Sequence, residues 1–227
     1  MNFSDYQFQN REILNKGKKW AHIIPHPFEE DEEIAWTPVW SLTTQQFKYL
    51  PTSYCYYGYT DLQDRFFCIG NSNGSAAGNS IEEAIFQGFM EVVERDAVAV
   101  WWYNRIKRPA VDLSSFNIEY VNKLEQYYET LGREFWVLDI THDFGIPTFA
   151  AISRTKKGSI EEMTFGFGTH FDPEIALTRA VTELNQFNVL LPDKKNTNFD
   201  REVLDWLNTA NLNNQPHFVP NSLIPKK

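Results

Sequence analysis

The spacing of hydrophobic and polar residues predicts strands in the first part of the chain and strands alternating with helices later. Residues 34–43 and 46–59 are rich in tryptophan, tyrosine, valine and threonine, which favour strands. Further strands are predicted at residues 64–70, 135–141, 146–155 and 163–171. Helical patterns cover residues 80–106, 115–131, 172–191 and 201–212. A turn at residues 43–45 would join the first two strands into a hairpin. Because strands precede a long helix and only then alternate with helices, we predict an α+β fold, a mixed sheet covered by helices, rather than a doubly wound parallel sheet.

Three regions of the chain differ in the strength of these patterns. Residues 1–33 predict a short helix followed by a loop, and we interpret the acidic run EEDEE in that loop as solvated. Residues 34–191 carry the strong patterns and form the predicted core. Residues 192–227 have a weaker pattern and end in PNSLIPKK, so we predict a weakly ordered C-terminal segment.

The stretch SIEEAIFQGFMEVVERDA, residues 80–97, places five carboxylates and one arginine in a predicted helix. Ser80 is a candidate N-cap, and Glu83 would complete a capping box. A helix turns about 100° per residue, so one quarter of its circumference presents an acidic stripe made of Glu83, Gln87, Glu91 and Glu94. Arg95 lies at the border of this stripe.

The acidic stripe needs compensation, because repeated like charge on one helix face costs a few tenths of a kcal/mol per pair. Solvent alone would suffice, and a solvated face stays open as an interpretation. The loop NSNGSAAGNS at residues 71–80 directly precedes the helix, and loop-to-helix junctions of this kind favour anions. It lacks the ending of a P-loop. Carboxylates beside an anion-binding loop indicate a Mg²⁺–phosphate site, and this is the more specific of our two hypotheses for the stripe.

A second polar group lies on the helix predicted at residues 172–191. Arg179, Glu183 and Gln186 are spaced so that they share one helix face. They form either an exposed ion pair of little energetic value or, if the two helices face each other, a group in which Arg179 neutralises part of the acidic stripe.

Composition and missing motifs exclude several classes of function. The formal net charge of −9 argues against binding nucleic acid through the bulk surface, so we expect no nucleic-acid partner. No apolar run of about 18 residues and no signal-peptide pattern occur, so we expect a cytoplasmic protein that does not engage a membrane. The sequence contains no CxxC or HExxH motif, and no catalytic residue is assigned.

Two motifs together resemble the YcaO family. They are SNGSAAGNSIEEAIFQGFMEVVERDAV at residues 72–98 and ALTRAVTELNQ at residues 176–186, while WTPVWSL and YLPTSYCYY upstream are similar to its heterocyclase branch. The resemblance implies a YcaO-like fold that binds ATP and Mg²⁺. It also implies a cyclodehydratase that phosphorylates a backbone amide and converts Cys, Ser or Thr of a ribosomal precursor peptide to azolines, as in the biosynthesis of thiazole/oxazole-modified microcins and other bacteriocins. An E1-like or leader-binding protein is the implied partner.

The resemblance also implies roles for individual residues. Glu91 and Glu94 would hold Mg²⁺, and Arg95 would meet phosphate. Arg179 and Glu183 are further site candidates with less defined roles. The complete set of implied nucleotide-binding residues is Ala76, Asn79, Glu83, Arg95 and Gln186.

The sequence departs from the family pattern in three ways. The family's ATP site has two similar halves, and a first Glu-x-x-Glu-Arg helix is absent here. Asn188 stands where family members often have an arginine, and the proline-rich C-terminus of the heterocyclases is missing. We therefore expect a partial domain, inactive alone, in which Glu83, Glu91 and Glu94 line a cleft open on one side. A YcaO protein that forms thioamides or amidines and a non-catalytic, oligomerising scaffold are the alternatives.

Overall fold

The structure is a computed structural model that describes residues 4–17, 23–31, 33–59, 67–68, 70–156, 158, 160–190 and 201–223. The chain divides into two compact units, Met1–Ser72 and Asn73–Lys227, and each is described by itself. Helices and two small sheets make up the described parts, which confirms the predicted α+β class. None of the described helices is both long and apolar enough to cross a bilayer.

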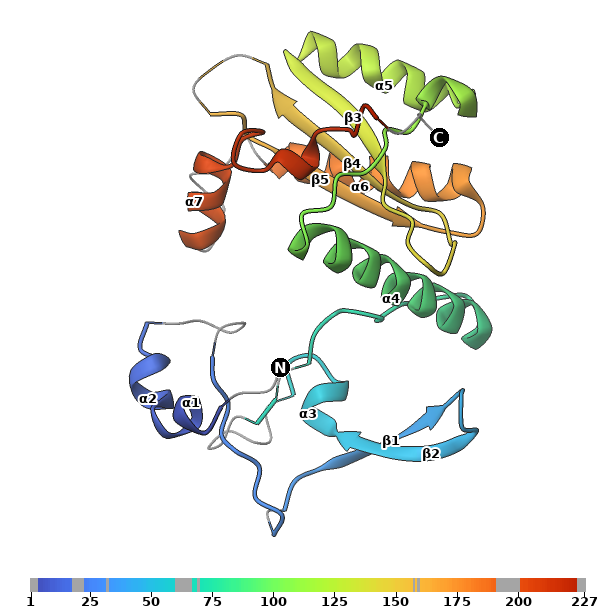
Figure 1. Ribbon diagram of the computed structural model, residues 1–227. Helices are drawn as coiled ribbons and strands as arrows, with labels where there is room; N and C mark the ends of the chain where they lie inside the picture. The colour runs from blue at the N-terminus through green and yellow to red at the C-terminus, as the bar shows by residue number, and fades with distance from the viewer. Residues whose placement is uncertain are drawn as a thin grey trace. The chain divides into compact units, whose positions relative to one another are not determined.

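The first unit contains short helices and one hairpin (Figure 1). Its elements are α1 Asp5–Gln9, α2 Arg11–Leu14, β1 Trp36–Ser41, β2 Gln46–Pro51 and α3 Thr52–Cys55. The antiparallel pairing of β1 with β2 confirms the predicted hairpin. The predicted strand at residues 46–59 is too long, because the chain turns into α3 directly after Pro51, where the Thr52 N–H still donates to the Ala35 carbonyl at 2.9 Å. Most of the strand predicted at residues 64–70 lies outside the described residues.

The second unit is built on a three-stranded antiparallel sheet of order β3-β4-β5. Its strands are β3 Arg133–Asp139, β4 Thr148–Thr155 and β5 Thr164–Thr169. They confirm the three strands predicted in this half, with ends shifted by a few residues. In both described sheets the pairing is antiparallel rather than mixed. The connections at residues 140–147 and 156–163 explain this pairing, since a parallel crossover needs about a dozen residues or more.

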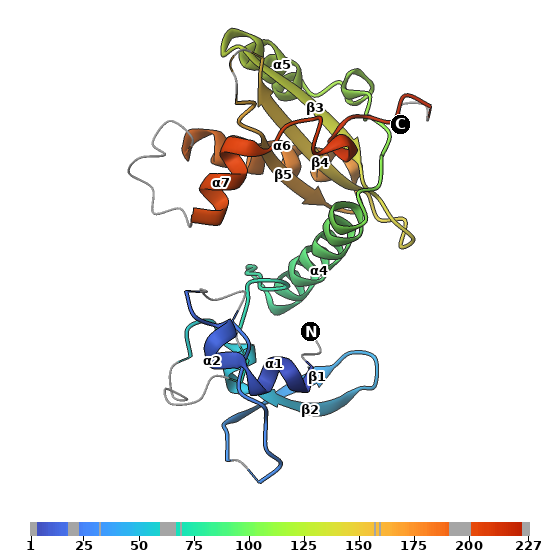
Figure 2. The same cartoon turned by 60° about the vertical axis from the view of Figure 1, so that its left-hand side comes forward.

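Helices cover both faces of this sheet (Figure 1, Figure 2). One face packs against α5 and α6, and the other packs against α4 and the chain's C-terminal part. The helical elements are α4 Ile81–Tyr103, η2 Leu113–Phe116, α5 Glu119–Thr130, α6 Pro173–Leu190, α7 Arg201–Thr209 and η4 Pro216–Phe218. The helix predicted at residues 115–131 is divided by Asn117, which adopts a left-handed conformation between η2 and α5.

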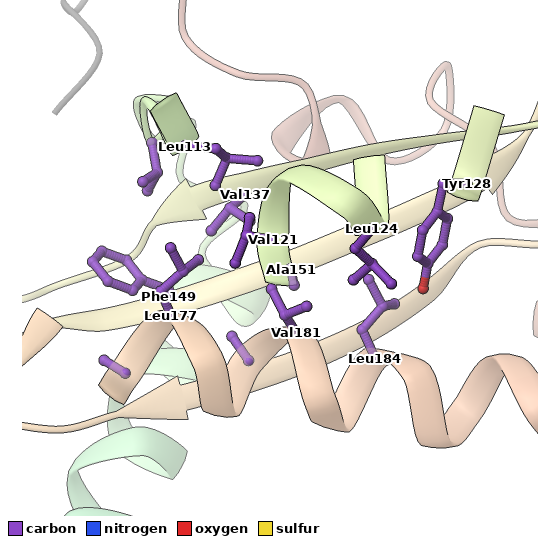
Figure 3. Close-up of a cluster of buried hydrophobic side chains, with 13 residues drawn as sticks. Leu113, Val121, Leu124, Tyr128, Val137, Phe149, Ala151, Leu177, Val181 and Leu184 are labelled. Atoms are coloured by element: carbon purple, nitrogen blue, oxygen red, sulfur yellow. The ribbon is translucent and has the colours of Figure 1, made fainter. Parts of the chain in front are cut away.

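The larger hydrophobic core lies between the sheet and helices α5 and α6 (Figure 3). Val121 and Leu124 of α5 pack there with Val181 and Leu184 of α6. Tyr128 is also buried and donates a hydrogen bond from its hydroxyl to Asn185 Oδ1 at 2.8 Å. This core joins the two helices to the same sheet face and so fixes α6 relative to β4 and β5.

Alternating glycine and phenylalanine give β5 two different faces. A Cβ atom on Gly166 would overlap the backbone of Ala180 and Leu184, and one on Gly168 would overlap that of α6 one turn earlier. The glycines therefore allow α6 to lie directly on the strand. Phe165 and Phe167 point to the opposite face and join the second core.

The C-terminal residues contribute to that second core. Phe218 and His217 are fully buried, and the Phe218 ring lies 5.5 Å from Trp101 and 5.2 Å from Trp102 between centroids. Trp136 Nε1 donates a hydrogen bond to the Phe218 carbonyl at 2.9 Å. Residues 201–223, which we expected to be weakly ordered, thus pack on the sheet, because their apolar side chains complete its second face. The predicted boundaries at residues 33 and 191 stay predictions.

Candidate active site

The loop before α4 and the first turn of that helix form one end of the site. Ser80 Oγ accepts a hydrogen bond from the Glu83 backbone N–H at 3.2 Å, which confirms Ser80 as N-cap. The Glu83 carboxylate accepts hydrogen bonds from the backbone and side-chain nitrogens of Asn79, at 2.7 and 3.1 Å. The reciprocal capping bond therefore reaches Asn79 rather than Ser80. Ala76 is exposed in the same loop.

The centre of the site is a charged group on α4. Arg95 Nε donates to Glu91 Oε1 at 2.8 Å, and Arg95 Nη2 lies 3.7 Å from Glu94 Oε1. Glu94 is only 8% exposed, although carboxylates are rarely buried. The sequence pattern placed both glutamates in the acidic stripe, and the structure shows them bridged by the arginine at its border.

Helix α6 brings two more charges to this group. Glu183 Oε2 accepts a hydrogen bond from the Phe167 backbone N–H at 2.6 Å. Arg179 donates to Gln87 Oε1 of α4 at 2.7 Å and to the Thr169 carbonyl at 3.2 Å. Of the two interpretations of this group, the structure favours the contact between the helices, since the hydrogen bond from Arg179 to Gln87 joins α4 and α6 directly.

The carboxylates at the centre are incompletely neutralised. Burial, followed by the charge of Glu183, raises the pKa of Glu94 to about 7, while Arg95 and Arg179 act in the opposite direction. Burial also raises the pKa of Glu183, against the hydrogen bond from Phe167 and the charge of Arg95. Buried carboxyl groups with raised pKa values gain from a nearby cation, so this group has the electrostatics of a cation-binding site.

The predicted residues separate into a central and a peripheral set. Glu91, Glu94, Arg95 and Glu183 form the centre. Glu83 is eight residues before Glu91, about 12 Å along the helix axis, and belongs to the loop end. Gln186 lies one turn beyond Glu183 and is exposed. The side chain of Asn188 lies outside the described part of the chain.

The donor set suits Mg²⁺ better than a metal held by protein alone. Within the described residues, no group of three or more His, Cys, Asp or Glu is arranged to hold a metal ion. Mg²⁺ is commonly bound by one or two carboxylates, with waters and substrate phosphates as the other ligands. Glu91 and Glu94 therefore fit as carboxylate ligands of a phosphate-bound Mg²⁺.

An aromatic cavity adjoins the charged centre. It has a volume of about 300 Å³ and is half open, and its lining includes Arg95 and Glu183. The remaining wall is largely apolar, with Trp102, Phe165, Phe167, Phe187 and Trp206 among its side chains. Sequence reasoning missed this cavity. The alternation in MTFGFG was its signal, because it predicts phenylalanines on one face of a strand.

A family model decides the identity of the chain. The model of YcaO cyclodehydratases, described as binding ATP and Mg²⁺, matches residues 1–227. The chain belongs to the YcaO family. The resemblance inferred from the two motifs is confirmed.

Solved structures of YcaO proteins and heterocyclases resemble the whole chain. A heterocyclase in complex with substrate and cofactor is 52% identical, with a TM-score of 0.88 over 99% of this chain. The heterocyclase TruD is 49% identical, with a TM-score of 0.84 over 99% of this chain. YcaO from Methanopyrus kandleri, bound with AMPPCP and Mg²⁺, is 26% identical, with a TM-score of 0.65 over 90% of this chain.

The chain spans only part of these proteins. It covers 30% and 31% of the two heterocyclase chains and 52% of the Methanopyrus chain. An uncharacterised protein of Methanothermobacter thermautotrophicus is 34% identical over 166 residues, which are 72% of this chain and 43% of that protein.

Proposed function

We propose that this chain contributes one wall of the ATP- and Mg²⁺-binding site of a peptide cyclodehydratase that forms azolines. The charged centre carries the proposal. Glu91, Glu94 and Arg95 of α4 lie there beside Glu183 of α6. The buried carboxyl group of Glu94 is only partly compensated by the positive charges around it. The 52% sequence identity to a heterocyclase solved with substrate and cofactor supports azoline formation as the reaction.

Each residue of the site has a proposed task. Glu91 and Glu94 would hold Mg²⁺, and Arg95, which now contacts Glu91, would meet phosphate. Arg179 and Glu183 position α6 against this group through Gln87 and the Phe167 N–H.

The loop end of the site faces the nucleotide. Asn79 and Glu83, which hydrogen-bond to each other here, would contact the nucleotide, and the exposed loop at Ala76 would offer backbone groups. Gln186 completes the nucleotide contacts from α6.

Bound ATP supplies the phosphoryl group that activates a peptide amide oxygen and leaves as phosphate when a Cys, Ser or Thr side chain closes the ring. The proposed substrate is a ribosomal precursor peptide, presented by an E1-like or leader-binding protein. The chain's own residues hold the nucleotide and orient the amide, and a low local dielectric strengthens their charges.

Isothermal titration calorimetry of the chain with ATP tests the proposal. We expect Mg²⁺-dependent binding with a Kd weaker than ~10 µM, since only one wall is supplied, and its loss in the double variant Glu91→Gln/Glu94→Gln. Glu119→Gln, on the exposed surface of α5, is the matched control and should bind like the parent. Equal ATP affinity with Mg²⁺ and with EDTA would contradict the proposal.

A further inference from the structure

The aromatic cavity has the chemistry of a side-chain pocket. The Trp102 and Trp206 rings lie 6.0 Å apart, and each is 5.5 Å from Phe165 between centroids. Aromatic pairs at these separations favour edge-to-face and offset contacts, so a further ring would find partners on several sides. The volume of about 300 Å³ is at the lower end of small-molecule sites, which span roughly 300–1,000 Å³. One large side chain therefore suits it.

The charged residues at this cavity belong to the charged centre. Arg95 and Glu183 are part of its wall, and they lie beside Glu94. A side chain inserted into the cavity beside Trp102 and Trp206 would therefore keep its own backbone close to these charges. The apolar wall offers no partners for phosphate groups, so the cavity complements the nucleotide site rather than extending it.

We propose that the aromatic cavity binds a large apolar or aromatic side chain of the peptide substrate, that of the residue directly before the cyclised Cys, Ser or Thr. The side chain anchors the peptide, and the amide that follows it lies at the charged centre, where it is activated. This inference rests on the proposed function, and it adds a preference for the residue before each ring.

Titration with two blocked dipeptides tests the subsite. N-acetyl-Phe-Ser-amide and N-acetyl-Ala-Ser-amide differ only in the side chain offered to the cavity. We expect the Phe peptide to bind at least tenfold more tightly and to shift the indole N–H signals of Trp102 and Trp206, assigned by Trp→Phe substitution. Equal affinity of the two peptides would overturn the inference.

Variants at the rim separate the cavity from the rest of the fold. Val203 is 43% exposed, so Val203→Trp fills the opening without disturbing the core and should remove the preference for Phe. Val100→Trp, on a 38% exposed site of α4 outside the cavity, is the matched control and should retain it. If Val203→Trp fails to fold, Phe187→Ala, at a 48% exposed position, should weaken Phe-peptide binding severalfold. An unchanged preference in the folded rim variant would contradict the inference.

Calorimetry with Mg²⁺ and ATP distinguishes the two proposals. Parent protein that binds the nucleotide but shows no preference for Phe contradicts the subsite alone. Parent protein that prefers Phe without Mg²⁺-dependent nucleotide binding contradicts the proposed function and leaves the cavity as a peptide-binding site.

Discussion

Glu94 occupies a position where stability and the proposed function conflict. Its carboxyl group is buried beside Glu183, and the nearby guanidinium of Arg95 compensates it only in part. A residue retained under such strain is typical of a binding site rather than of a structural ion pair. The sequence identified this residue by its helical phase, but its burial depends on α6 and is absent from any local pattern.

The pKa of Glu94 predicts how the free protein responds to pH. Its pKa is near 4.5 in the unfolded chain and about 7 in the folded one, so the folded state holds an extra proton between these values. The contribution of this residue to the free energy of unfolding therefore falls as pH rises from 4.5 to 7, by about 3 kcal/mol at most. Glu94→Gln should remove this dependence and stabilise the metal-free protein at pH 8.

Urea unfolding at pH 5 and pH 8 measures the effect of Glu94→Gln. Glu119→Gln, on the exposed surface of α5, should match the parent at both pH values. A Glu94→Gln protein that is less stable than the parent at pH 8 would show that its negative charge is stabilising and would refute this account.

At the scale of elements, the contact between β5 and α6 determines where the charges meet. Glu183 accepts the N–H of Phe167 because α6 lies directly on the strand. The two glycines of β5 make that approach sterically allowed, and the phenylalanines that alternate with them line the aromatic cavity on the other face. One six-residue strand thus supports both the charged centre and the proposed subsite.

Gly166→Ala should separate these elements. The added methyl group overlaps the backbone of α6, which cannot move aside as a flexible side chain can. We therefore expect the free energy of unfolding to fall by about 3 kcal/mol or more, at the upper end of overpacking costs. Gly132→Ala is the control, because it meets open space but has a φ of +68° and should cost about 1–2 kcal/mol from backbone strain alone. Thermal unfolding of both variants checks the order, and a Gly166→Ala protein no less stable than Gly132→Ala would contradict it.

Sequence patterns predicted individual elements better than their pairing. Ser80 as N-cap made α4 evident, and the FGFG alternation marked β5. The strand predicted beyond Pro51 was wrong because tyrosines at residues 54 and 56 favour strands locally, whereas the chain forms α3 there. The aromatic cavity could not be predicted, since its side chains come from α4, β5, α6 and α7 and meet only through tertiary packing.

At the scale of the whole molecule, the chain's C-terminal part bears on acid stability. His217 is 1% exposed, and its ring nitrogens have no hydrogen-bond partner among the described residues. Burial, together with the charge of Arg105, lowers its pKa to about 4. The unfolded chain takes up this proton below about pH 6.5, so the contribution of His217 to stability falls as pH is lowered from about 6.5 to 4, opposite in sign to that of Glu94.

The contributions of Glu94 and His217 oppose each other between pH 4.5 and 6.5, so removing either one should expose the pH dependence of the other. His217→Leu should remove the acid-sensitive part and stabilise the protein at pH 5 by about 1–2 kcal/mol relative to the parent, with little change at pH 8. Denaturant unfolding across this range checks the slope. A His217→Leu protein that is destabilised equally at pH 5 and pH 8 would indicate a packing defect instead.

The glycines of β5 also limit how the first half of α6 can change in length. Gly166 faces Ala180 and Leu184, so α6 has one register on the strand. A one-residue insertion between Ala176 and Ala180 would rotate the rest of the helix by about 100° and carry Glu183 away from the Phe167 N–H. Substitutions on the exposed side of α6 leave that register intact. Among homologues, this segment should therefore vary in residue identity but not in residue number.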